Sequence, residues 1–162
     1  MRSKISKRGK LNGLRVAPHY GCHFLRPRKH RSVDRVLHEI VYAIGGEPVD
    51  YREENTCCGA GGGVRSAEKE LSLKYTLRKI ESMREARVDC LVSPCIFCHL
   101  QFDVGQRELY EKRIIDRVIP VVHITQLVGL ALGLKPEEVG LNKNYSWNLP
   151  GGNLRWSFER KA

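Results

Sequence analysis

Asp89 to His99 read DCLVSPCIFCH. The apolar run from Cys90 to Val92 predicts a buried strand that ends before Pro94, because proline cannot donate to the hydrogen-bond ladder of a central strand. Cys95 and Cys98 follow at once, where a helix is expected to begin. This segment therefore predicts a strand that delivers two thiols to its carboxyl end.

Strand-like and helix-like segments alternate along the rest of the chain. Strands are expected over 14–20, 47–51, 88–92 and 119–124, and helices over 33–44, 64–86, 95–109 and 125–133. This alternation is typical of βαβ units. We therefore predict an α/β fold with a mostly parallel four-stranded sheet and flanking helices in Rossmann-like layers. Pro48 favours an edge position for the second strand, Leu71 is expected to face inward, and Thr125 is expected to cap the last helix.

Five of the six cysteines come after a predicted strand. Cys22 follows the first strand, and two more thiols follow each of the next two: Cys57 and Cys58, then Cys95 and Cys98. Right-handed crossovers place the carboxyl ends of parallel strands at one edge, where open α/β sheets bind ligands. We therefore expect all five thiols at that edge. The sixth, Cys90, lies within a strand and is interpreted as a small buried hydrophobe.

Three kinds of site could use these thiols. A zinc site usually takes two Cys-x-x-Cys pairs, whereas Cys57 and Cys58 are adjacent and their side chains diverge. A redox dithiol at Cys95 and Cys98 would leave the other three cysteines unused. An iron–sulfur centre would use all five thiolates and would let the adjacent Cys57 and Cys58 reach different irons, so the spacing favours it.

A glycine-rich loop follows the adjacent pair. Residues 59–63 read GAGGG, which matches neither a P-loop nor a dinucleotide-binding motif. We expect Gly59 and Gly61 to let backbone N–H groups approach the sulfur atoms of a cofactor. His19, His23 and His99 flank the cysteines; each could donate a proton to a leaving thiolate, although local packing explains each more simply.

The net charge of +10 is concentrated near the N-terminus. Residues 1–35 contain eleven Lys or Arg and one acid, whereas the remaining residues hold 17 of each sign. Residues 1–12 are expected to form a basic flexible tail. Arg26 and Arg28 directly follow Cys22 and indicate an anionic partner there.

Composition narrows the class of protein. The 162 residues suffice for one domain with a real core. No run of 18 apolar residues and no secretory signal are found, so we expect a cytoplasmic protein without a membrane span. Six cysteines in that reducing compartment favour metal or redox chemistry. The basic residues lack interleaved aromatics, which argues against a nucleic-acid-binding zinc protein.

The spacing Cys22…Cys57-Cys58-Gly59…Cys95-x-x-Cys98 resembles that of the cysteine-rich CCG domain, over about residues 13–135. The segments YGCHFLRP at 20–27 and PCIFCHLQFD at 94–103 are similar to the B subunit of heterodisulfide reductase from methanogenic archaea. We therefore expect residues 13–135 to form a CCG iron–sulfur domain and residues 136–162 to form an extended C-terminal tail.

The resemblance implies a non-cubane [4Fe–4S] centre. Its ligands would be Cys22, Cys57, Cys58, Cys95 and Cys98. It also implies electron transfer, in methanogenesis, from partner subunits that carry flavin and cubane clusters to the mixed disulfide of coenzyme M and coenzyme B. His23 is then the candidate proton donor, and Arg26 and Arg28 would bind the sulfonate and phosphate of this anionic disulfide substrate.

The reductase's B subunits have two CCG halves, whereas this chain carries one, which resembles the C-terminal half. A second CCG half or a homodimer is therefore expected to complete the site. The alternative function is an electron-transfer or scaffold module that holds the cluster without turnover. CCG relatives that handle lactate, glycolate or succinate leave the substrate open.

Overall fold

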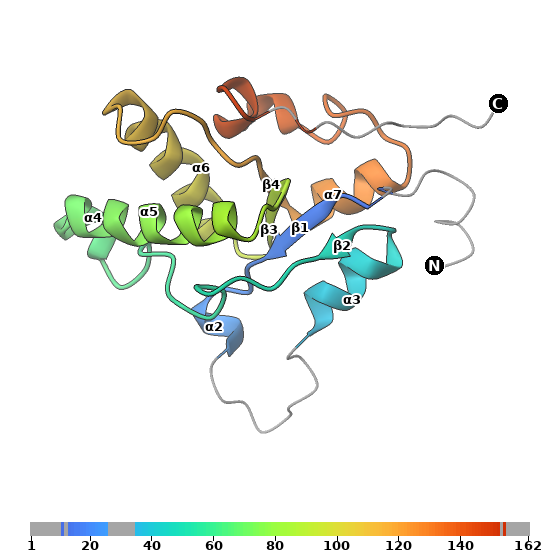
Figure 1. Cartoon of the computed structure of the whole chain (residues 1–162), viewed down its shortest axis with the longest axis horizontal. Helices are drawn as coiled ribbons and strands as arrows, with labels where there is room; N and C mark the ends of the chain where they lie inside the picture. The colour runs from blue at the N-terminus through green and yellow to red at the C-terminus, as the bar shows by residue number, and fades with distance from the viewer. Residues whose placement is uncertain (1–10, 12, 26–34, 153, 155–162) are drawn as a thin grey trace.

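Figure 1 shows the computed structural model of the chain, which describes residues 11, 13–25, 35–152 and 154. These residues build a four-stranded sheet in the order β2-β1-β3-β4. The strands are β1 (Arg15–Pro18), β2 (Glu47–Pro48), β3 (Cys90–Ser93) and β4 (Val121–His123). Every pairing is parallel, so the predicted α/β fold is confirmed. β2, which contains Pro48, lies at the edge as expected.

Helices cover both faces of the sheet (Figure 1). One face packs against α3 (Val36–Ala43) and α7 (Ile124–Ala131). The other packs against α5 (Lys69–Glu85) and α6 (Ile96–Glu111). The shorter elements are α2 (Cys22–Leu25), α4 (Val64–Ala67) and two 3-10 turns, η1 (Leu141–Lys143) and η2 (Ser146–Asn148).

The strand pleat divides the core between these two faces, because successive side chains point to opposite sides. Val16 and Cys90 pack towards α3 and α7, whereas Ala17 and Leu91 pack towards α5 and α6. A strand buried on both faces must be apolar throughout, which explains the continuous apolar run of β3. Cys90 has no exposed surface, and burial raises the pKa of its thiol, so its interpretation as a buried hydrophobe is confirmed.

The helix predicted over 64–86 is broken. Glu68 has a non-helical backbone (φ −131°, ψ 65°) and separates α4 from α5. The inward prediction for Leu71 is wrong, since this side chain is 45% exposed. Ser72 is buried instead, and its hydroxyl donates a hydrogen bond of 2.9 Å to the carbonyl of Gly59. The start of α5 therefore holds the loop that carries Cys57 and Cys58.

The cap predicted for the last helix is also wrong. α7 begins at Ile124, directly after β4, so Thr125 lies inside the helix. His123 is the N-cap: its side chain accepts from the backbone N–H of Thr125, and the side chain of Gln126 accepts from the backbone N–H of His123. Because strand and helix join without a loop, the last strand residue provides the cap.

The chain after α7 packs back onto the domain. Leu141 is fully buried, and the Asn144 side chain donates to the carbonyl of Val121 in β4 at 2.8 Å. The boundaries predicted at residues 12 and 135 stay predictions. Within the described ranges, no helix combines the length and apolar composition that crossing a membrane requires.

Candidate metal centre

Cys95 and Cys98 lie where β3 passes into α6. Cys95 is the N-cap of α6, with an extended backbone (φ −97°, ψ 117°), and Cys98 lies in the first turn. The backbone N–H of Cys95 donates to the Ser93 hydroxyl at 3.3 Å. The junction thus holds both thiols at the carboxyl end of a central strand, as the sequence predicts.

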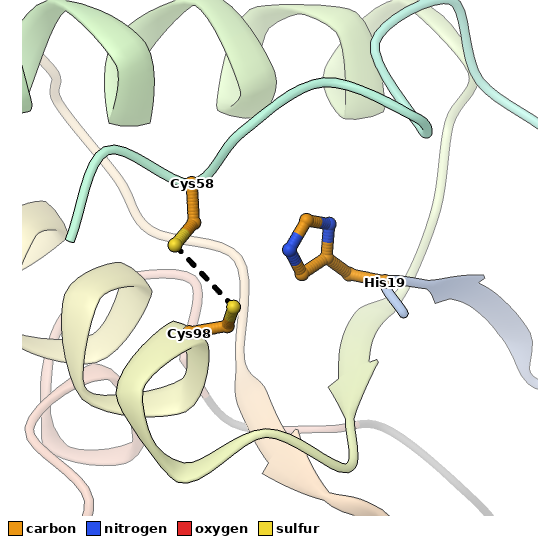
Figure 2. Close-up of side chains that lie close together, drawn as sticks. All are labelled: His19, Cys58 and Cys98. Atoms are coloured by element: carbon orange, nitrogen blue, oxygen red, sulfur yellow. Dashed lines mark hydrogen bonds between the residues drawn. The ribbon is translucent and has the colours of Figure 1, made fainter. Parts of the chain in front are cut away.

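Cys58 approaches this pair from the loop before α4. The Sγ atoms of Cys58 and Cys98 lie 3.3 Å apart, although 40 residues separate them in the chain (Figure 2). Both side chains are buried, whereas Cys57 is exposed beside them. The loop before α4 and the first turn of α6 are therefore in contact through these two sulfur atoms at the edge of the sheet.

The segment after β1 closes the site from a third direction. Gly21 has a φ of +81°, and a Cβ atom built on it would lie 3.1 Å from the Sγ of Cys98 and 3.5 Å from the Cβ of Cys95. The next residue, Cys22, is exposed at the start of α2. Burial raises the pKa of the Cys57 thiol, and the nearby Cys58 and Cys22 raise it further by smaller amounts. Cys22 therefore lies near Cys57. The five predicted thiols thus come from three segments that converge.

Backbone N–H groups of the glycine-rich loop point at the sulfurs. The N–H of Gly59 donates to the Sγ of Cys57 at 3.3 Å. Gly59 has a φ of +87° and lies so close to α5 that a Cβ would be 2.9 Å from the Cβ of Tyr75. Only glycine fits there without strain. Gly61 is exposed, and a Cβ on it would meet no atom within 4 Å, so its role stays a prediction.

His19 lies directly behind the two buried thiols. It has no exposed surface, and its Nδ1 is 3.5 Å from the hydroxyl of Tyr51. Its Nε2 has no hydrogen-bond partner among the described residues. One ring nitrogen lies within 4.8 Å of the sulfurs of Cys58 and Cys98, and Figure 2 shows it pointing towards them. An unpaired buried nitrogen aimed at two thiols fits a site that holds a further group.

Comparison with known proteins identifies the family of this chain. Residues 16–103 match the CCG family, which is described as a cysteine-rich domain. The chain belongs to the CCG family. This matched range contains Cys22, Cys57, Cys58, Cys95 and Cys98.

Two archaeal relatives carry the name of a heterodisulfide reductase. The CCG chain is 47% identical to the B subunit of the ferredoxin/F420H2-dependent CoB–CoM heterodisulfide reductase of Methanosarcina acetivorans, over 84% of this chain and 47% of the relative. It is 45% identical to the B subunit of the ferredoxin:CoB–CoM heterodisulfide reductase of Methanosarcina mazei, over the same shares of each chain. The resemblance to the reductase's B subunit is thereby confirmed.

A bacterial relative has a different name. The 8-methylmenaquinol:fumarate reductase membrane anchor subunit of Wolinella succinogenes is 36% identical, over 89% of this chain and 51% of the relative. The CCG chain therefore spans about half the length of each of these three relatives.

The two buried thiols differ in acidity. The hydrogen bond from Cys98 lowers the pKa of Cys58, and the same contact raises the pKa of Cys98. Cys58 is therefore the more acidic thiol of the pair, and thiolates are the ligands that iron–sulfur centres and zinc use. Burial lowers the pKa of His19, which favours a neutral ring beside them.

The structure says less about the other predicted site residues. His23 is exposed on α2, next to Cys22. His99 is buried, with its ring centre 6.2 Å from that of His123. Arg26 and Arg28 lie outside the described residues.

Sequence reasoning missed two residues near the site, Tyr51 and Lys79. Lys79 is buried on the inner face of α5, and its Nζ lies 5.5 Å from the ring centre of Tyr51. The available signal is helical spacing: Thr76 follows Ser72 by four residues, Lys79 follows Thr76 by three, and all three are buried.

Proposed function

We propose that this CCG domain is a catalytic half-subunit of a heterodisulfide reductase. It would bind a non-cubane [4Fe–4S] centre through Cys22, Cys57, Cys58, Cys95 and Cys98, and reduce the coenzyme M–coenzyme B disulfide. The names of the two archaeal relatives support this reaction.

One observation carries the proposal: the sulfurs of Cys58 and Cys98 lie 3.3 Å apart, with Gly21 and the unpaired Nε2 of His19 against them. In a reducing compartment, thiols crowded this closely fit a metal centre better than a structural disulfide. The adjacent Cys57 adds a donor that one small ion would not need, which supports a centre of several irons.

When bound, such a centre would supply one-electron transfers. Reducing a disulfide to two thiols takes two electrons and two protons. The chain's own residues would set the surroundings of this reaction. Gly59 donates its N–H to the sulfur of Cys57, and hydrogen bonds to cluster sulfur raise a reduction potential. His23, exposed beside Cys22, remains the candidate proton donor, and Arg26 and Arg28 remain candidates for binding the anionic substrate.

The proposed reaction requires partners. The electrons would come from subunits that carry flavin and cubane clusters, and a second CCG half or a second copy of this chain would complete the site. Apolar side chains with exposed fractions of 45–69% surround the thiols on α2 and at the start of α6, which supports a protein partner at this edge: Phe24, Ile96, Phe97 and Leu100.

The second candidate is an electron-transfer module without its own turnover. The similarity to a fumarate reductase subunit favours this reading, because that relative is not named for disulfide chemistry. Both candidates require the cluster and differ only in whether a thiol substrate binds at it.

The test uses the chain purified without oxygen. The proposal predicts a brown protein with iron and sulfide near about four each per chain. Its EPR spectrum after oxidation is expected to change when coenzyme M thiol is added, whereas an unchanged spectrum supports the electron-transfer module. Zinc without iron would contradict both candidates.

A further inference from the structure

Lys79 is a cation buried deep in α5, with only 1% of its surface exposed. Its Nζ donates hydrogen bonds to the backbone carbonyls of Glu53 and Glu54. Among the ion pairs of the described ranges, none includes Lys79; the carboxylate of Glu53 pairs with Arg52 and Arg78 instead. A buried ammonium without a paired anion is costly, so its position calls for negative charge nearby.

A chain of contacts leads from this ammonium to the thiols. The Nζ of Lys79 lies 5.5 Å from the ring centre of Tyr51, and the hydroxyl of Tyr51 lies 3.5 Å from the Nδ1 of His19. The ring of His19 faces Cys58 and Cys98 (Figure 2). Lys79 therefore lies behind the inner wall of the cysteine site, on the side away from solvent.

Burial and nearby charges set the pKa of the Lys79 ammonium. Burial lowers the pKa of Lys79 to about 8, whereas the negative charges of Cys58, Glu53, Cys98 and Cys57 act to raise it. A pKa near 8 leaves the ammonium protonated at pH 7.

We propose that Lys79 is the buried counter-charge of the cysteine site and raises the reduction potential of the centre held there. This inference rests on the proposed function, because it requires a redox centre at these thiols. Reduction adds one negative charge at the site, and a cation in a poorly screened interior stabilises that charge. Lys79 acts through its field and touches no substrate.

Three substitutions separate charge from structure. Lys79→Gln removes the charge but keeps a donor for the two carbonyls, Lys79→Met removes both, and Lys79→Arg keeps the charge. Lys74→Met is the matched control, since Lys74 lies on the exposed face of the same helix. The midpoint potential is measured by titrating each iron-loaded protein with dithionite and following its EPR signal.

We expect the Gln and Met variants to bind wild-type amounts of iron and to shift to a lower potential. The Arg and Lys74→Met proteins are expected to keep the wild-type potential. Loss of iron from Lys79→Gln and Lys79→Met, with full iron in Lys79→Arg and Lys74→Met, also supports the inference. The positive charge at residue 79 is then needed to hold the centre. An unchanged potential in Lys79→Gln, or loss of iron from all three Lys79 variants, overturns it and leaves the proposed function standing. Wild-type protein that binds no iron overturns both.

Discussion

Gly21 packs directly against Cys98: a Cβ atom at Gly21 would lie 3.1 Å from the thiol sulfur. The contact joins the segment after β1 to the first turn of α6. It also explains how the exposed Cys22 is brought to the edge of the buried site, since Cys22 is the next residue.

The first prediction follows from this contact. Gly21→Ala places a methyl group against the Cys98 sulfur and should lower the iron bound per chain. Gly13→Ala is the control, because Gly13 also has a positive φ, of +71°, but no atom lies within 4 Å of its Cβ position. Both variants should lose about 1–2 kcal/mol of stability from backbone strain. Equal iron contents in the two variants would contradict the prediction.

The second prediction concerns the buried Asp103 on α6. Its carboxylate accepts the backbone N–H groups of Tyr145 and Ser146, at 2.8 and 2.7 Å, and so ties the C-terminal segment to the domain. Asp103→Ala leaves both donors unpaired and should lower the free energy of unfolding by about 3 kcal/mol, as measured by urea denaturation.

The matched control for that experiment is Asp116→Ala, at a side chain that is 83% exposed. Its effect is expected to stay within about 0.5 kcal/mol. Asp103→Asn keeps one acceptor oxygen and should fall between the two. Similar losses for Asp103→Ala and Asp116→Ala would show that the C-terminal segment does not depend on this carboxylate.

The third prediction concerns substrate binding by the basic run after Cys22. Reversing the charges of Arg26 and Arg28 to Glu should raise the KM for the coenzyme disulfide in the assembled complex by about tenfold or more, because each lost charge-assisted hydrogen bond is worth about 1.5–3 kcal/mol. Reversing Lys4 and Lys7 is the control for general charge. An unchanged KM would remove the role of the two arginines, while leaving the cluster proposal intact.

The cysteine edge could be predicted because it follows from topology alone. Cys95 comes three residues after an apolar run that predicts a buried strand, and parallel strands present their carboxyl ends together. No side-chain detail was needed to bring the segments of Cys22, Cys58 and Cys98 to one place.

The missed features depend mainly on tertiary contacts between segments that lie far apart in the sequence. The break at Glu68 changes which residues of α5 face inward, so that Ser72 is buried in place of Leu71. His123 caps α7 because β4 ends where the helix begins. Lys79 is a surface residue by type; helical spacing places it on the inner face of α5, but its partners, the carbonyls of Glu53 and Glu54 and the ring of Tyr51, come from a distant segment.

The central claim is that the converging thiols hold a centre of several irons. The most direct measurement is iron and sulfide per chain, purified without oxygen, in wild type, Cys58→Ser and Cys90→Ala. We predict about four irons and four sulfides in wild type and in Cys90→Ala, whose thiol is buried between apolar side chains away from the site, and severe loss of both in Cys58→Ser. Iron that is absent from wild type, or retained in full by Cys58→Ser, would contradict the account.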